Sequence, residues 1–240
     1  MPPAPADPTA PRDPRPSVDV IFYVDIHRLT LPYGAVSQNA EFWQKLNEQI
    51  LDPATYDVLQ RNGLRVGEAS IADWDYFKSL IEQHPATSTQ SVLIGRDSRN
   101  VEIPMKDNIP FQNIFHFDQR NTLVGRSFDR SDNLFSISFQ PTPRRAGAMR
   151  LTVSPVVRSE RKRLEFSVLH EERPEIQYVS PEMLLPCNLR LDVPYQSFIV
   201  IGPSPEAAWP LSIGHAFLIS QGKSELQEHV LFIVPWPRPR

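Results

Sequence analysis

Histidine and cysteine are the side chains that most often carry catalysis or bind metals, and this chain has six histidines and one cysteine. The histidines are His27, His84, His116, His170, His215 and His229. None lies two, three or four residues from another, which is the spacing by which one strand or helix presents two ligands to one metal ion. We therefore expect no metal site.

The sequence also lacks the pattern of a nucleophile or a cofactor loop. The one cysteine, Cys187, stands among Leu and Pro residues, a setting typical of a buried apolar side chain. The acids near aromatic residues, Asp25, Asp73 and Asp75, lack a paired base and are interpreted as helix caps or solvated side chains. No phosphate-binding loop, dinucleotide fingerprint or nucleophile elbow occurs. We expect a protein that is not an enzyme and binds no cofactor.

The elements that carry these residues are read from hydrophobic periodicity. Residues 18–31 predict a strand buried on both faces, and three helices are expected at 39–50, 53–61 and 71–83. From Ser88 onward the chain alternates short apolar segments with turn residues, which indicates strands. These are expected at 89–96, 99–104, 111–117, 133–140, 148–158, 163–170, 175–179, 188–193, 197–202, 214–219 and 226–234.

Length and composition bound the class of protein. The chain has 240 residues with 25 Pro and 9 Gly, and seven of the first 16 residues are Pro. Residues 1–17 are therefore expected to be a disordered, Pro-rich tail, and 18–240 a single domain with a helical insert at 39–67. The net charge of −3 provides no field that attracts nucleic acid, so no nucleic-acid partner is expected. No apolar run reaches the length of a membrane-spanning helix, and no export signal is visible.

Two segments place apolar side chains on one side of an expected strand, and the second, residues 135–140, alternates apolar and polar residues throughout. One places Phe111, Phe115 and Phe117 on one side, and the other does so with Phe135, Ile137 and Phe139. An ordinary half-buried strand explains this alternation. A strand that faces a membrane or a lumen also explains it, so these six residues are the candidate interaction positions.

The order of the segments resembles the secretin family, the ring-forming channel proteins of bacterial type II and type III secretion and of type IV pilus systems. The similarity is one of pattern and spans roughly 18–235. Its pieces are residues 20–29, 76–81, 91–94, 99–104, 108–111, 147–157, 193–202, 214–218 and 225–235. Among them, Phe198-Ile-Val-Ile-Gly resembles the late family strand that ends in Val-Ile-Gly-Gly, with Gly202 at the family's turn and Pro203 in place of its second glycine.

The resemblance implies an α+β, mainly β fold, with curved sheets like the secretin core and two or three covering helices. It also implies a non-catalytic homo-oligomer in the cell envelope, at the outer membrane or in the periplasm, with other secretion components as partners and contact with the outer membrane. Only about 15 residues, rich in charge, join 111–117 to 133–140. That leaves room for a charged loop or for one hairpin built from the flanking strands. The alternative function is therefore a secretin-derived scaffold protein without a pore.

Overall fold

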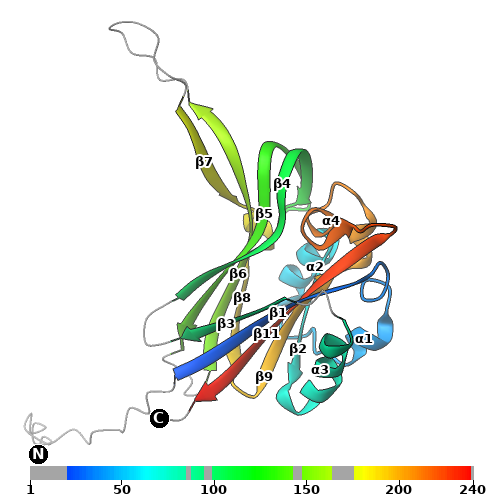
Figure 1. The fold of residues 1–240 in the computed structure, drawn as a ribbon, viewed down its shortest axis with the longest axis vertical. Helices are drawn as coiled ribbons and strands as arrows, with labels where there is room; N and C mark the ends of the chain where they lie inside the picture. The colour runs from blue at the N-terminus through cyan, green and yellow to red at the C-terminus, as the bar shows by residue number, and fades with distance from the viewer. Residues whose placement is uncertain (1–20, 85–87, 95–98, 143–147, 164–175, 239–240) are drawn as a thin grey trace, which may run out of the picture.

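The computed structural model describes residues 21–84, 88–94, 99–142, 148–163 and 176–238. The Pro-rich segment 1–17 and most of the strand expected at 163–170 lie outside the described residues. The described chain is an α+β structure made mainly of strands, as expected, and its strands form two antiparallel sheets (Figure 1).

The first sheet brings the two ends of the described chain together. Its strand order is β2-β9-β11-β1-β3, with β10 paired to β11. The central pair, β1 and β11, is antiparallel along the whole of β1, from Ile21 opposite Arg238 to Pro32 opposite Gln227. The strands are β1 (Ile21–Pro32), β2 (Leu64–Ser70), β3 (Ser88–Ile94), β9 (Ser197–Pro203), β10 (Ile219–Gln221) and β11 (Leu226–Arg238).

The second sheet contains longer strands and follows the order β4-β5-β6-β7. Strand β8 also pairs with β6 and lies off this path. Its strands are β4 (Arg99–Phe117), β5 (Leu123–Pro141), β6 (Ala148–Arg163), β7 (Ile176–Met183) and β8 (Leu189–Pro194). The ribbon formed by β6 and β7 extends beyond the other described strands, at the top of Figure 1.

The main core lies between the two sheets. Val24 and Ile26 of β1 belong to the same buried cluster as Phe135, Ile137 and Phe139 of β5. A second cluster covers the opposite face of the first sheet, where the helices α1 (Ala40–Gln44) and α3 (Trp74–Gln83) pack. Two helices therefore cover one face. The other two, α2 (Pro53–Arg61) and α4 (Ile213–Leu218), contribute to the main core.

The helix predictions succeed where capping residues mark both ends. Helix α2 spans 53–61 as predicted, with Asp52 accepting a hydrogen bond from the Thr55 amide and Gly63 following in a left-handed conformation. Helix α1 begins after the Asn39 cap but has only five residues, because Asn47 already pairs with Glu68 at the edge of β2. The expected strand 214–219 was wrong, because Ser212 caps a buried helix there through the His215 amide.

The segment between 111–117 and 133–140 is a single hairpin. Strands β4 and β5 pair along their length and are joined by the short turn 118–122, so the charged residues after 122 lie on β5 and not in a long loop. Register shifts between Pro104 and Ile109 interrupt the pairing, and Asn108 and Arg130 adopt positive φ there. The alternative of one hairpin built from the flanking strands is the one observed.

Candidate functional site

The second candidate strand faces the interior of the chain. Phe135, Ile137 and Phe139 are at most 1% exposed and belong to the main core between the sheets. Their polar neighbours Ser136 and Ser138 lie on the other face, half-buried. The three apolar side chains are therefore core residues. Of the two interpretations of this segment, the ordinary half-buried strand is the one observed.

The first candidate strand carries an aromatic face that is partly open to solvent. Phe111 is 56% exposed, Phe115 and Phe117 are half-buried, and Leu123, opposite Phe117 on β5, is 46% exposed. The ring of Trp209 lies 6.0 Å from the ring of Phe115. We call these five residues the hairpin face. Sequence alternation identified three of them, whereas Trp209 lies too far along the chain for any periodicity to connect it.

A glycine makes room for the Phe115 ring on the hairpin face. Phe115 is paired with Gly125 across β4 and β5, and a Cβ atom on Gly125 would lie 2.6 Å from the Phe115 ring. The ring therefore lies over the glycine and covers backbone that a side chain would otherwise protect. This packing brings the ring within reach of Trp209.

Asn62 fixes the hairpin to the body of the protein. Its side chain is buried, and Oδ1 accepts a hydrogen bond from the Phe117 amide at 2.8 Å. Its Nδ2 donates to the Phe117 carbonyl at 2.9 Å and to the Val58 carbonyl at 2.8 Å. The residue that ends α2 therefore also pairs with the edge of β4. From sequence it was recognised only as a helix end.

We expect Asn62→Ala to lower the free energy of unfolding by about 2–4 kcal/mol, because it removes the partner of both the Phe117 amide and the Phe117 carbonyl, whereas the Val58 carbonyl keeps its bond from the residue-62 amide. Urea denaturation measures this loss, and hydrogen exchange at the Phe117 amide should accelerate. Asn113→Ala is the matched control, since the exposed Asn113 accepts one hydrogen bond, from Ser127. Equal, small losses in both variants would contradict the role given to Asn62.

Three basic side chains lie between the sheets, of which His229 is buried and Lys106 and Arg28 are half-buried. Lys106 donates a hydrogen bond from Nζ to the His215 carbonyl at 2.9 Å, and burial lowers its pKa to about 8. Arg28 donates to the Pro104 carbonyl across the two sheets. His229 lies between two hydroxyls, with Thr30 Oγ1 3.1 Å from Nδ1 and Ser220 Oγ 2.8 Å from Nε2.

The serine–histidine contact at Ser220 and His229 does not favour a nucleophile. Burial first, and the charges of Arg28 and Lys106 second, lower the pKa of His229 to about 4. An imidazole of that pKa is a weak base at neutral pH, and a threonine hydroxyl stands at Nδ1 where catalytic triads place a carboxylate. The pair is better explained as a buried histidine whose two nitrogens are hydrogen-bonded.

We expect the protein to lose stability as the pH falls from about 6.5 to about 4. The unfolded chain protonates His229 near pH 6.5, while the folded chain resists protonation down to about 4. One residue with this shift changes the free energy of unfolding by about 3 kcal/mol. Burial also lowers the pKa of His27, His116 and His215, which adds loss in the same direction.

Urea unfolding curves at pH 7 and pH 4.5 measure this loss. The variant His229→Gln should lose distinctly less stability over the same interval, since its side chain does not titrate. An equal loss in the wild type and in the variant would show that His229 is not responsible.

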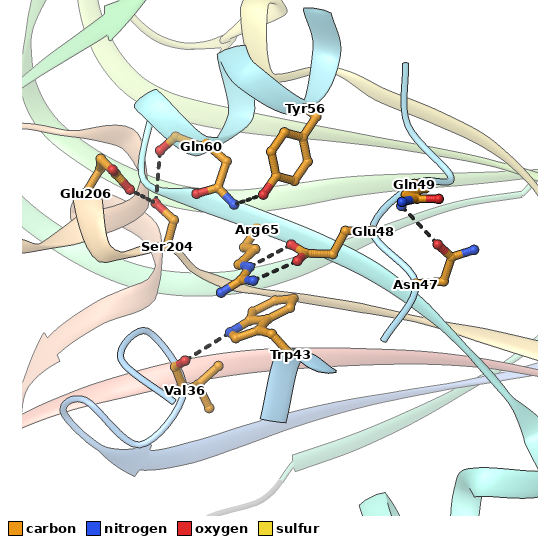
Figure 2. A network of polar contacts seen from close by, with 10 residues as sticks. All are labelled: Val36, Trp43, Asn47, Glu48, Gln49, Tyr56, Gln60, Arg65, Ser204 and Glu206. Carbon is orange, nitrogen blue, oxygen red and sulfur yellow. Dashed lines mark hydrogen bonds and ion pairs between the residues drawn. The ribbon is translucent and has the colours of Figure 1, made fainter. Parts of the chain in front are cut away.

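Gly202 lies inside strand β9, not in a turn, and this corrects the role expected from the resemblance. It pairs with Arg65 of β2, and a Cβ atom there would lie 3.1 Å from the Trp43 ring. The Trp43 indole donates a hydrogen bond to the Val36 carbonyl at 2.9 Å (Figure 2). Arg65 lies over the same ring and forms two hydrogen bonds with Glu48, at 2.6 and 2.7 Å. The glycine therefore makes room for the tryptophan.

The projecting ribbon of β6 and β7 leaves strand edges open. Strand β5 pairs with β6 only as far as Ser131 opposite Ser159, whereas β7 pairs with β6 up to Ile176 opposite Arg163. Beyond Ser159 and Ser180, which are opposite each other, the ribbon has two strands and, within the described residues, no third. We call this part, residues 160–163 and 176–179, the arm.

The described residues carry no group of three or more histidine, cysteine or acidic side chains placed to hold a metal ion. Burial raises the pKa of the Cys187 thiol, which keeps the side chain protonated and unreactive. None of the helices in the described ranges is long and apolar enough to cross a membrane.

Comparison of the chain with protein families, with curated proteins and with solved structures yields no match.

Proposed function

We propose that the chain is a non-catalytic, secretin-like subunit of a bacterial envelope secretion or pilus apparatus. In this proposal it forms or scaffolds an oligomeric ring for protein transport, together with other envelope components. The arm is the observation that carries the proposal. An isolated two-stranded ribbon is marginally stable in water, and a third strand or a packed face is needed to hold it.

A neighbouring copy can supply that third strand. Strand β7 is one edge of the second sheet, and β4 is the edge on the opposite side. Pairing of an edge on one copy with a different edge on the next is a head-to-tail contact, which closes into a ring when the rotation between copies is suitable. Ring closure also removes open edges that would otherwise promote uncontrolled aggregation.

A pore-less scaffold is the second candidate, and the hairpin supports it. Arg126, Asp129 and Arg130 are exposed on β5 beside the hairpin face. Charges at these positions are costly on a lipid-facing strand. In this alternative the hairpin face contacts protein, and the assembly is stable without detergent.

The test shortens the arm. Because Ser159 and Ser180 are directly opposite, residues 160–179 can be replaced by Asn-Gly, which forms a two-residue hairpin turn. The variant keeps Arg158 with its partner Glu102 and Glu182 with its partner Arg126. We expect it to unfold at nearly the wild-type temperature but to remain a monomer. An assembly equal to that of the wild type would overturn the role of the arm.

Two single prolines provide a second test that preserves the arm. Adjacent residues of a strand direct their N–H groups to opposite edges of that strand. One of the variants Tyr178→Pro and Val179→Pro therefore removes a donor that points toward β6, and the other removes a donor that points toward the outer edge. We expect one of the two to keep the unfolding temperature and to lose assembly. Two folded variants that both assemble normally would contradict pairing through this edge.

A further inference from the structure

A groove of about 440 Å³ lies on the helix-covered face of the first sheet, between α3 and the strands β1 and β3. Two tryptophans line it, Trp74 from α3 and Trp236 from β11. Their rings meet edge-to-face at 6.2 Å, and Trp74 also packs edge-on against Phe198 at 5.1 Å. These contacts hold Trp74 in place, so the groove has fixed aromatic walls.

The charge of the groove is negative. Asp25 from β1 and both Asp75 and Glu82 from α3 supply three carboxylates, against one ammonium group from Lys78. Lys78 forms an ion pair with Glu82 at 3.7 Å. Both side chains are exposed, so the ion pair is weak. Burial lowers the pKa of His27, which favours its neutral form.

Indole rings beside carboxylates are suited to a guanidinium group. A guanidinium group stacks on aromatic faces and forms paired hydrogen bonds with carboxylates. Aromatic-lined grooves of this kind also bind proline-rich peptides, whose extended conformation is already formed before binding. Together these properties favour a proline-rich peptide that carries arginine.

The chain contains such a segment close to the groove. Residues 8–17 read Pro-Thr-Ala-Pro-Arg-Asp-Pro-Arg-Pro-Ser, with Arg12 and Arg15, and lie outside the described residues. Asp25 lies four residues after the start of β1 at Ile21, or about 13 Å along the strand. Arg15 precedes Ile21 by six residues, which span up to about 20 Å when extended. The segment is therefore long enough to turn back and reach the groove.

We propose that the groove between α3 and β1 binds the arginine-bearing, proline-rich segment 8–17 of the same chain. In this arrangement a guanidinium group of the segment lies between the indoles and the carboxylates of Asp75 and Glu82, and the prolines lie along the aromatic walls. The inference goes beyond the proposed ring function and does not depend on it.

The test is a calorimetric titration with a synthetic peptide of residues 8–17. The peptide is added to the full chain and to the full-length variant Arg12→Ala/Arg15→Ala. In this variant the attached segment no longer competes with the peptide for the groove. We expect the peptide to bind this variant and to bind the wild type at least tenfold more weakly, because an attached competitor acts at a high effective concentration. A peptide with both arginines replaced by alanine should bind neither.

A groove variant completes the test. Adding Asp75→Asn/Glu82→Gln to the double-alanine chain should weaken binding at least tenfold, whereas adding Glu41→Gln, an exposed acid on α1, should not. No binding to any chain would overturn the proposal. Equal binding to the wild type and to the double-alanine chain would also overturn it, because the chain's own segment would then not occupy the groove.

Discussion

Gly214→Ala should destabilise the protein by about 3–5 kcal/mol, although the residue lies in a helix. A Cβ atom at this position would lie 2.0 Å from the Gly63 carbonyl oxygen and 2.4 Å from its carbonyl carbon. Both obstacles are backbone. The segment cannot easily yield, because the Gly63 carbonyl accepts from the Ser204 amide at 3.0 Å and the Asn62 carbonyl accepts from the Gly214 amide at 2.8 Å.

The sign of the effect makes this prediction informative. In an ordinary exposed helix, replacement of glycine by alanine stabilises by about 0.5–1 kcal/mol. Gly34→Ala is the matched control, because Gly34 has φ +87° but only the Gln38 side chain nearby, at 3.5 Å. This control variant should lose about 1–2 kcal/mol of unfolding free energy from backbone strain alone. Urea denaturation compares the two, and a loss at Gly214 no larger than that at Gly34 would show that α4 and the Asn62-Gly63 turn are not in close contact.

We expect Glu228→Ala to lower the free energy of unfolding by about 3–5 kcal/mol. The substitution removes a buried hydrogen-bond acceptor and leaves its donors without a partner. The side chain of Glu228 on β11 is 0% exposed. Its carboxylate accepts from the amides of Gly34 and Val36 at 2.8 Å, and from the amide and the hydroxyl of Ser37. One side chain therefore holds the turn that follows β1.

A graded series separates this role from a general effect of charge removal. Glu228→Gln keeps the shape but places an amide donor among donors, so it should lose about 2 kcal/mol. Glu225→Ala removes an exposed acid from the preceding turn and should change stability by no more than about 0.5 kcal/mol. If the Glu228 variants resembled Glu225→Ala in thermal and urea unfolding, the carboxylate would not hold the turn.

Local patterns predicted the elements whose determinants are local. Helix α2 carries Asp52 and Pro53 at one end and Asn62 and Gly63 at the other, and it has the predicted bounds. The alternation at Phe111, Phe115 and Phe117 correctly placed three rings on one face, because side chains on a strand alternate whatever lies opposite. The apolar segment Ile213–Leu218 was ambiguous, since a short, fully buried helix shows no periodicity that excludes a strand.

The features that hold the candidate site in place depend on residues far apart in the sequence. Asn62 contacts Phe117, 55 positions further along the chain, and Phe115 contacts Trp209. The bonds of Glu228 to the turn after β1 exist only once β11 pairs with β1. A charged residue in an otherwise apolar strand was the available signal for Glu228. Its partners could not be identified, because strand pairing was not predictable from a single sequence.

The mass of the full chain in solution, measured by light scattering with and without detergent, tests the central claim of assembly most directly. We expect a defined multiple of the 27.4 kDa chain mass. Assembly that requires detergent would favour the channel, and assembly in water alone would favour the scaffold. A monomer of 27.4 kDa in both conditions, even at high protein concentration, would contradict the account.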